Sequence, residues 1–284
     1  MRVSFACITN VGLVRKNNED NFVVVNGEDG SPHLSPPDSC SGAGDTAGRG
    51  MLFAVADGMG GARAGEVASR IAVEAIGRVG QQMTDGDDNR AVRQRILAAI
   101  EEANLEIYNA SVQNPMQRGM GTTLTVACVR RGRIQFFQVG DSMGYIARRG
   151  KLHTMTKSHS LRDTMKSDGV ISRGHAEQFE RGKNIILRAV GVEENVKIDY
   201  SEREFDGGDL VFLCTDGLHG AFRDRELRER FANRPEDTTE FCAGLVQESM
   251  DRGGKDNITA IVVAAKNGEA APRQRWWARL FRSR

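Results

Sequence analysis

Short runs of apolar residues, either alternating with polar ones or rich in β-branched side chains, recur along the chain and predict β-strands. The predicted strands occupy residues 2–9, 21–25, 51–56, 123–129, 134–139, 143–149, 209–214 and 258–265. The runs at 51–56 and 209–214 are apolar throughout, which is typical of strands buried on both faces. Because short turns join the three runs between 123 and 149, we expect these strands to form an antiparallel meander.

Apolar residues spaced three or four positions apart predict helices between the strands. One such face runs from Val67 to Val79, a second lies near 90–110, and a third lies near 237–251. Each amphipathic helix needs an apolar surface to cover, and the strands provide it. The simplest consistent fold class is therefore α+β, with antiparallel sheets packed face to face as a β-sandwich and helices outside.

Two polar segments interrupt this pattern. Residues 26–50 hold Gly, Ser or Pro at 13 of 25 positions, which leaves little apolar surface to order them, and we expect a mobile surface loop. This loop is not a domain boundary, because the apolar strand at 51–56 follows it directly. Residues 157–184 are rich in charges and poor in large apolar groups, and they predict a second excursion over the surface.

Composition narrows the possible functions. The 39 Lys and Arg against 38 Asp and Glu leave a net charge of +1, which excludes a general electrostatic attraction to nucleic acid or to an anionic membrane. The five cysteines are scattered without a Cys-x-x-Cys pair, which predicts reduced thiols and a cytoplasmic protein. The first residues lack the pattern of a signal peptide, and no run approaches the roughly 18 apolar residues of a membrane-spanning helix.

Acidic residues recur next to the most apolar strands. Asp57, Asp141 and Asp216 each follow such a strand; Asp256 precedes another, and each of the four neighbours a glycine or a polar turn residue. Taken singly, each of them is more typical of an acid in the turn that ends a strand. Their repetition favours a metal site, because like charges gathered at one end of a sheet repel unless cations lie among them. Oxygen donors without a His or Cys cluster favour Mg²⁺ or Mn²⁺ over Zn²⁺.

Six short motifs occur in order across about residues 3–265, and together they resemble the metal-dependent protein phosphatases, the type 2C serine/threonine phosphatase family, in its bacterial form. The motifs are Arg15-x-x-x-Glu19-Asp20, AVADGMGG at 54–61 followed by Gly65-Glu66, GMGTT at 119–123, VGDS at 139–142, LCTDGL at 213–218 and GGKDNIT at 253–259. Each motif is weakly specific alone, whereas six in register are strongly specific. The resemblance implies a β-sandwich flanked by pairs of α-helices, with two Mn²⁺ or Mg²⁺ ions in a cleft at one edge.

The same resemblance implies how the metal pair would be held. Asp57 would bridge the two ions, and the carbonyl of Gly58 would bind one of them. Asp216 and Asp256 would complete the shell of the other ion. Two divalent ions placed side by side activate a water molecule for in-line attack on phosphorus, so no phosphoenzyme is expected.

Further roles follow from the resemblance. Glu19 and Asp20 would hold metal-bound waters, with direct metal binding as the alternative for Glu19. Asp141 would bind, together with Asp216, the third and looser ion of bacterial members. Arg15 would contact the phosphate, for which its planar guanidinium is suited; a solvated turn arginine is the alternative.

The chain departs from the family's pattern at two positions. Met59 stands where many eukaryotic relatives have a histidine proposed as general acid, so a metal-bound water or another residue must protonate the leaving group. His159 is one candidate, although we favour a surface histidine without a catalytic role. Ser158 stands where relatives often have an aspartate, and residues 160–182 match the family's variable flap only loosely.

Two other features remain open to more than one interpretation. We interpret GMGTT at 119–123 as structural, with glycines for close packing and threonines for a strand, and a direct catalytic role is less favoured. Lys183 and Asn184 are equally compatible with a place in the cleft and with a helix cap.

A basic aromatic tail at 266–284 follows a catalytic domain at 1–265. One face of a helix in this tail would carry Trp276, Trp277, Leu280 and Phe281. This pattern predicts a peripheral contact with a membrane or with a partner groove. The alternative is a helix docked on the protein's own surface or a frayed end of the chain.

These observations predict a cytoplasmic phosphatase that hydrolyses phosphoserine and phosphothreonine on proteins by metal-activated water. Its partner would be a phosphorylated protein substrate, such as a Ser/Thr kinase or a kinase target in a signalling or secretion system, and no nucleic acid is expected. The alternative is a metal-poor regulatory module that binds phosphoproteins without turnover. The intact Asp57, Asp216 and Asp256 favour the enzyme.

Overall fold

The structure is a computed structural model that describes residues 1–60, 64–167 and 185–266. Predictions about Lys183, Asn184, most of the flap and the tail lie outside the described residues. Within the described ranges, no helix combines the length and the apolarity that crossing a bilayer requires.

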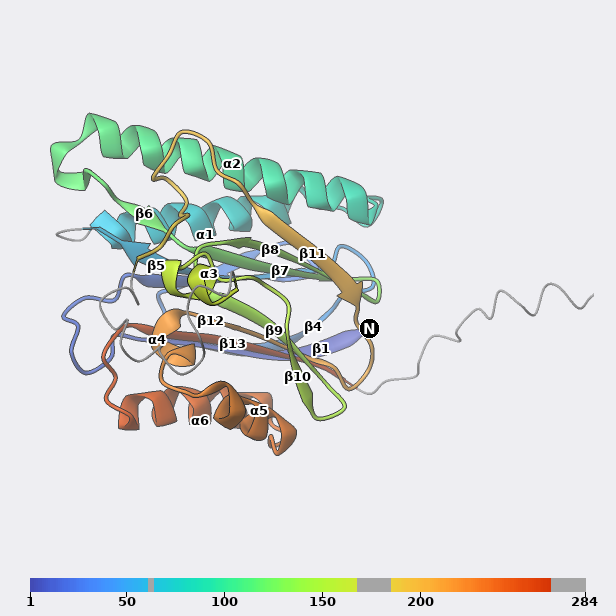
Figure 1. Ribbon diagram of the computed structural model, residues 1–284. Coiled ribbons are helices and arrows are strands. Elements are labelled where there is room, and N and C mark those ends of the chain that lie inside the picture. The colour runs from blue at the N-terminus through green and yellow to red at the C-terminus, as the bar shows by residue number, and fades with distance from the viewer. Residues whose placement is uncertain (61–63, 168–184, 267–284) are drawn as a thin grey trace, which may run out of the picture.

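Two antiparallel sheets pack face to face in the described part of the chain (Figure 1). The six-stranded sheet has the order β10-β9-β12-β13-β1-β4. Its strands are β1 (Arg2–Asn10), β4 (Ser39–Asp45), β9 (Met143–Arg148), β10 (Lys151–Thr154), β12 (Leu210–Cys214) and β13 (Ile258–Ala265). The seven-stranded sheet has the order β11-β8-β7-β5-β2-β3, with β6 paired to β5. Its strands are β2 (Asp20–Val25), β3 (Pro32–Leu34), β5 (Met51–Met59), β6 (Gly121–Thr122), β7 (Leu124–Arg130), β8 (Arg133–Val139) and β11 (Asp199–Glu204).

Helices cover both outer faces, which confirms the predicted α+β sandwich (Figure 1). The helices of the described residues are α1 (Ala64–Gln82), α2 (Asn89–Gln113), η1 (Pro115–Gln117), α3 (Leu161–Ser167), α4 (Asp216–His219), α5 (Asp224–Ala232) and α6 (Thr238–Asp251). Helix α1 packs on β5 and β2 of the seven-stranded sheet, and α6 packs on β13 and β1 of the other. The three predicted helices correspond to α1, α2 and α6.

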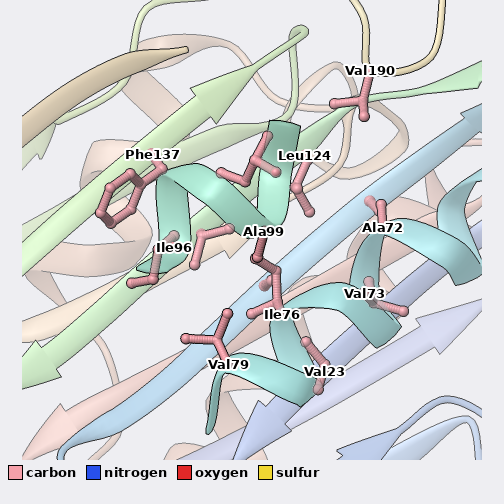
Figure 2. Close-up of a cluster of buried hydrophobic side chains, with 14 of the residues drawn as sticks. Val23, Ala72, Val73, Ile76, Val79, Ile96, Ala99, Leu124, Phe137 and Val190 are labelled. Carbon is pink, nitrogen blue, oxygen red and sulfur yellow. The ribbon is translucent and has the colours of Figure 1, made fainter. Parts of the chain in front are cut away.

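The described residues form three apolar layers, one between the sheets and one under each helical face. Figure 2 shows the layer under α1 and α2, in which Ile76 of α1 and Ile96 of α2 belong to one apolar cluster with Phe137 of the sheet. Between the sheets, the rings of Phe5 and Phe53 meet edge to face with centroids 5.8 Å apart. Each such side chain contributes roughly 1.5–3 kcal/mol when fully buried, so these layers hold the strand ends in fixed relative positions.

The prediction of a loop across 26–50 is wrong, because this segment contains β3 and β4. These strands pair with β2 and β1 at the edges of the two sheets. Glycine serves close packing here: a Cβ added to Gly42 would lie 2.9 Å from the ring of Phe5, and one added to Gly44 would lie 2.5 Å from the sulfur of Met51. An edge strand needs backbone hydrogen bonds from one neighbour only, so few apolar side chains suffice to form it.

The predicted meander is wrong at its third strand. Strands β7 and β8 form a hairpin, but β9 pairs with β12 and β10 in the opposite sheet. Gly140 makes the crossing with a φ of 99°, and a Cβ there would lie 2.6 Å from Thr123. The crossing places Asp141 between a strand that ends in one sheet and a strand that begins in the other.

Candidate active site

Five of the predicted acidic residues come from both sheets and lie near one another, at the end of the sandwich that carries α4 and β6 (Figure 1). Asp20, at the start of β2, lies opposite Asp57 in the register of β2 and β5. Burial raises the pKa of Asp57 well above its usual value, and neighbouring carboxylates raise it further. These neighbours are Asp20, Asp216, Asp141 and Asp256. The fold thus gathers acidic side chains that are far apart in the sequence.

Asp20 is buried and joins the two sheets. Its Oδ2 atom accepts hydrogen bonds of 2.7 Å from the hydroxyls of Thr215 and Thr259. Thr259 belongs to β13 of the opposite sheet, and Thr215 lies in the turn that follows β12 of the same sheet. Its Oδ1 atom is buried and has no partner among the described residues. Burial raises the pKa of Asp20 to about 7, although the two threonine hydrogen bonds oppose the shift.

The backbone of Asp57 is held by two threonines of the GMGTT motif. The Asp57 amide donates to the hydroxyl of Thr123 at 2.9 Å. The Asp57 carbonyl accepts two further hydrogen bonds of 2.9 Å, from the amide of Thr123 and the hydroxyl of Thr122. This motif therefore fixes the orientation of Asp57 through its peptide groups, and its role in the structure is positional.

The backbone around Gly58 is packed too closely for any side chain. A Cβ at Gly58 would lie 2.2 Å from the carbonyl oxygen of Gly65 in α1 and 2.7 Å from that of Glu19. The Glu19 carbonyl accepts from the Gly58 amide at 3.1 Å and from the Ser69 hydroxyl at 2.6 Å. These contacts fix Glu19 beside the end of β5. Burial raises the pKa of the Glu19 carboxyl, and the charge of Arg15 opposes this shift.

Asp141 and Asp216 also lie within range of each other. Burial raises the pKa of Asp141 to about 7, and the charge of Asp216 adds to the shift. Burial likewise raises the pKa of Asp216, the first residue of α4. Each has a buried Oδ1 atom without a hydrogen-bond partner among the described residues. His219 donates from Nε2 to the carbonyl of Asp141 at 3.1 Å, which ties α4 to the crossing between the sheets.

Arg15 and Asp256 form an ion pair at the rim of this acidic group. Nη2 of Arg15 lies 2.8 Å from Oδ2 of Asp256, and the two side chains are 49% and 30% exposed. The hydrogen bond to Asp256 raises the pKa of Arg15. The structure thus places the guanidinium beside the carboxylates and leaves it accessible to an anion from solvent.

Asn257 organises the site, although it is not among the site residues predicted from the sequence. Its Oδ1 atom accepts a hydrogen bond of 2.8 Å from the amide of Glu19. Its Nδ2 atom donates to the carbonyls of Val11 and Asn17, each at 2.9 Å. One amide group therefore joins the turn before β2 to the turn before β13. Its position inside the motif at 253–259 is the sequence feature that could have identified it as a site residue.

His159 is not a surface residue, so the favoured interpretation of this histidine is wrong. Its side chain is only 5% exposed. Nδ1 accepts a hydrogen bond of 3.1 Å from the amide of Gly140, and Nε2 lies 3.1 Å from Oδ2 of Asp199. Burial lowers the pKa of His159, although Asp199 opposes the shift, so the neutral ring is favoured. The polar neighbours Ser158 and Ser160 made this segment resemble a surface loop in the sequence. Both serines are in fact buried as well.

Buried oxygen atoms without partners show whether a metal ion fits this site. Such atoms are costly in a protein interior, and in the described residues they include the Oδ1 atoms of Asp20, Asp141 and Asp216. Among the described residues, no group of three or more acidic, His or Cys side chains is already placed to hold a metal ion. The donors are all oxygen, and hard divalent cations such as Mg²⁺ and Mn²⁺ fit such a set.

The chain is similar in sequence to known phosphatases. The family model described as protein phosphatase 2C matches residues 34–258. The serine/threonine phosphatase stp of Listeria monocytogenes serotype 4b is 32% identical over 255 residues, which cover 90% of this chain and 93% of the relative.

Solved structures are similar over nearly the whole chain. The crystal structure of the Mycobacterium tuberculosis serine/threonine phosphatase PstP/Ppp aligns with a TM-score of 0.76 and 30% identity, covering 94% of this chain and 100% of the other. A structure of the PstP catalytic domain in complex with two manganese ions aligns with a TM-score of 0.75, at the same identity and coverage.

Proposed function

The chain belongs to the protein phosphatase 2C family and is a serine/threonine protein phosphatase, and from this premise we propose that its reaction takes place at the acidic end of the sandwich. Phosphatases of this family use a metal pair. For this chain we propose Mn²⁺ or Mg²⁺, with two ions bound together and a third held more loosely. When bound, such ions activate water and offset the negative charge of the phosphoryl oxygens.

The proposed ligands of the metal pair are the carboxylates of Asp57, Asp216 and Asp256 and the carbonyl of Gly58. The loosely held ion would take Asp141 together with Asp216. The observation that carries this proposal is the group of buried carboxylate oxygens without partners, two of which belong to Asp141 and Asp216. A cation would satisfy these oxygens and offset both the burial and the carboxylate repulsion that raise the pKa of Asp57.

Other residues would orient these ligands and the substrate. Asp20, fixed by its two threonine hydrogen bonds, and Glu19, fixed through its backbone, would order water around the ions. Arg15 would bind the phosphate through its guanidinium. Its ion pair with Asp256 keeps this group at the rim, and an incoming phosphate dianion would share or take over those N–H donors.

Metal-dependent hydrolysis of p-nitrophenyl phosphate and of phosphothreonine peptides tests the assignment. Asp57→Ala should abolish turnover and remove most of the rise in Tm that Mn²⁺ produces in the wild-type chain. Asp206→Ala, which changes an exposed aspartate before β12, at the opposite end of that strand from Asp216, should keep both. Turnover that persists in a chelator would contradict the proposed mechanism. Phosphopeptide binding without any turnover would instead favour a regulatory module.

We further propose that residues 1–265 form the catalytic domain of a cytoplasmic enzyme whose phosphoprotein substrate is a Ser/Thr kinase or a kinase target. The tail at 266–284 would contact a membrane surface or a partner. Deletion of residues 268–284 should leave turnover of a small phosphopeptide unchanged and alter localisation. Loss of folding on this deletion would show that the tail belongs to the domain. Phosphoproteomics of cells lacking the enzyme would identify the substrate.

A further inference from the structure

Cys7 of β1 and Cys40 of β4 lie directly opposite each other in the antiparallel register. Two residues further along, the amide of Thr9 donates to the carbonyl of Asp38 at 2.8 Å. Because hydrogen-bonded pairs alternate along an antiparallel ladder, Cys7 and Cys40 also form such a pair, with Cα atoms about 5.5 Å apart. This separation lies within the range that a disulfide spans. Both cysteines are free thiols.

The two thiols differ in accessibility and in acidity. Cys7 is fully buried between the sheets, whereas Cys40 lies on the edge strand β4 and is partly exposed. A hydrogen bond with Cys7 lowers the pKa of Cys40. Burial raises the pKa of Cys7 well above its usual value. A partly exposed thiol of lowered pKa beside a second thiol is typical of a cysteine that an oxidant attacks and a neighbour then resolves.

The three other cysteines are buried, and none of them lies opposite another cysteine in a strand pair. Cys128, Cys214 and Cys242 belong to β7, β12 and α6, and burial raises the pKa of each. We propose that Cys7 and Cys40 form a modification site at which a peroxide generates an intramolecular disulfide between β1 and β4.

The proposed reaction balances with one peroxide as the oxidant. The Cys40 thiolate attacks a peroxide oxygen, the O–O bond breaks, and the departing hydroxide takes up a proton as the first water. Cys40 is then a sulfenic acid. The Cys7 sulfur attacks the Cys40 sulfur, the S–O bond breaks, and the hydroxyl leaves with the Cys7 proton as the second water. The two thiols lose two electrons in total, and the peroxide gains them.

This disulfide would fasten the edge strand β4 to the interior strand β1. A crosslink stabilises a fold chiefly by restricting the unfolded chain, so we expect oxidation to raise the Tm by about 5 °C. The bond would be open to reductants because Cys40 is partly exposed, and dithiothreitol should restore the original Tm.

The test uses the full chain treated with hydrogen peroxide and digested with trypsin without reduction. The wild-type chain should yield a disulfide between the peptide 3–15, which contains Cys7, and the peptide 17–49, which contains Cys40. Cys40→Ser should lose both the crosslink and the rise in Tm while it keeps basal hydrolysis of p-nitrophenyl phosphate. Cys242→Ser, the matched control, should keep the crosslink.

Cys7→Ala provides a second variant that separates the two chemical steps. In this variant Cys40 should accumulate as a sulfenic acid that a dimedone probe labels, because the resolving thiol is missing. Two results would overturn the proposal. One is wild-type Cys40 oxidised to the sulfinic acid without any link to Cys7; the other is a disulfide that joins Cys40 residues of two chains.

Discussion

Nδ1 of His159 lies 3.1 Å from the amide nitrogen of Gly140 and accepts its hydrogen bond. Gly140 is the residue at which the chain crosses from one sheet to the other, and Asp141 follows it. A ring nitrogen can accept this hydrogen bond only while it is unprotonated. The buried histidine therefore couples the segment that follows β10 to the position of a candidate metal ligand.

His159→Ala should lower the free energy of unfolding by about 1–3 kcal/mol, because the Gly140 amide loses its buried partner. It should also raise the Mn²⁺ concentration needed for half-maximal turnover, because Asp141 is less well positioned. His159→Gln keeps an acceptor and should retain most of both properties. Urea unfolding and Mn²⁺ titration of turnover measure these effects, and equal losses in the two variants would contradict the positional role.

The same histidine makes stability depend on pH. Burial lowers its pKa in the folded state, with Asp199 opposing this shift and Arg188 and Lys157 adding to it. As the pH falls below about 6.5, the unfolded chain therefore binds a proton before the folded chain does, and stability decreases. Above that pH neither form is protonated and the contribution is constant. The Tm of the wild-type chain should fall more steeply between pH 7 and pH 5.5 than that of His159→Gln; parallel curves would refute this account.

Thr123→Val should impair catalysis without changing the side-chain volume greatly. It removes the hydroxyl that accepts from the Asp57 amide and that lies 2.7 Å from the hydroxyl of Ser142 in the interior. We expect a loss of about 1–3 kcal/mol in unfolding free energy and a fall in kcat of roughly tenfold or more, because Asp57 is misplaced. Thr154→Val, at an exposed position of β10, is the control and should leave kcat unchanged.

Gly58→Ala and Gly244→Ala should have opposite effects on stability. A Cβ at Gly58 would lie 2.2 Å from the carbonyl oxygen of Gly65, so the backbone of β5 or α1 must move. A Cβ at Gly244 of α6 would meet nothing within 4 Å, and alanine there should stabilise the helix by about 0.5–1 kcal/mol. Thermal unfolding of the two variants gives the comparison. A Gly58→Ala protein as stable as the wild type would show that this close approach is dispensable.

Arg15→Lys should weaken substrate binding markedly and change the stability of the fold only slightly. The ion pair with Asp256 is exposed, so its loss should change the free energy of unfolding by only about 0–1 kcal/mol. A lysine cannot present two parallel N–H donors to phosphate, and KM for a phosphothreonine peptide should rise by roughly tenfold. Lys16→Ala removes an adjacent exposed charge and should leave KM within about twofold. An unchanged KM in Arg15→Lys would rule out a phosphate contact.

Most of the fold could be predicted because burial on both faces produces continuous apolar runs. Strand β5 and strand β12 are examples, as are the helical faces of α1 and α6. Strand β4 escaped prediction because its glycines pack against large side chains of other strands, such as Phe5. Strand β11, with the sequence DYSERE, escaped because one edge contact to β8 suffices to form it.

The candidate site could likewise be predicted from the sequence only in part. The positions of Asp57, Asp141, Asp216 and Asp256 beside apolar strands, and the order of the motifs, mark these residues as a group in the sequence alone. No pattern in the sequence identifies the residues that orient these acidic side chains. The hydroxyl of Thr259, for example, reaches Asp20 across 239 positions of the chain.

The amino-acid order by itself determined the alternation of strands and helices and the acidic residues at strand ends, because these depend on neighbours a few positions apart. Tertiary structure alone decided that β9 joins the opposite sheet, that His159 is buried, and that Cys7 lies opposite Cys40. Each of these depends on which distant segments the core brings together. Such pairings depend on the packing free energy of the whole chain, so the pattern of neighbouring residues does not predict them.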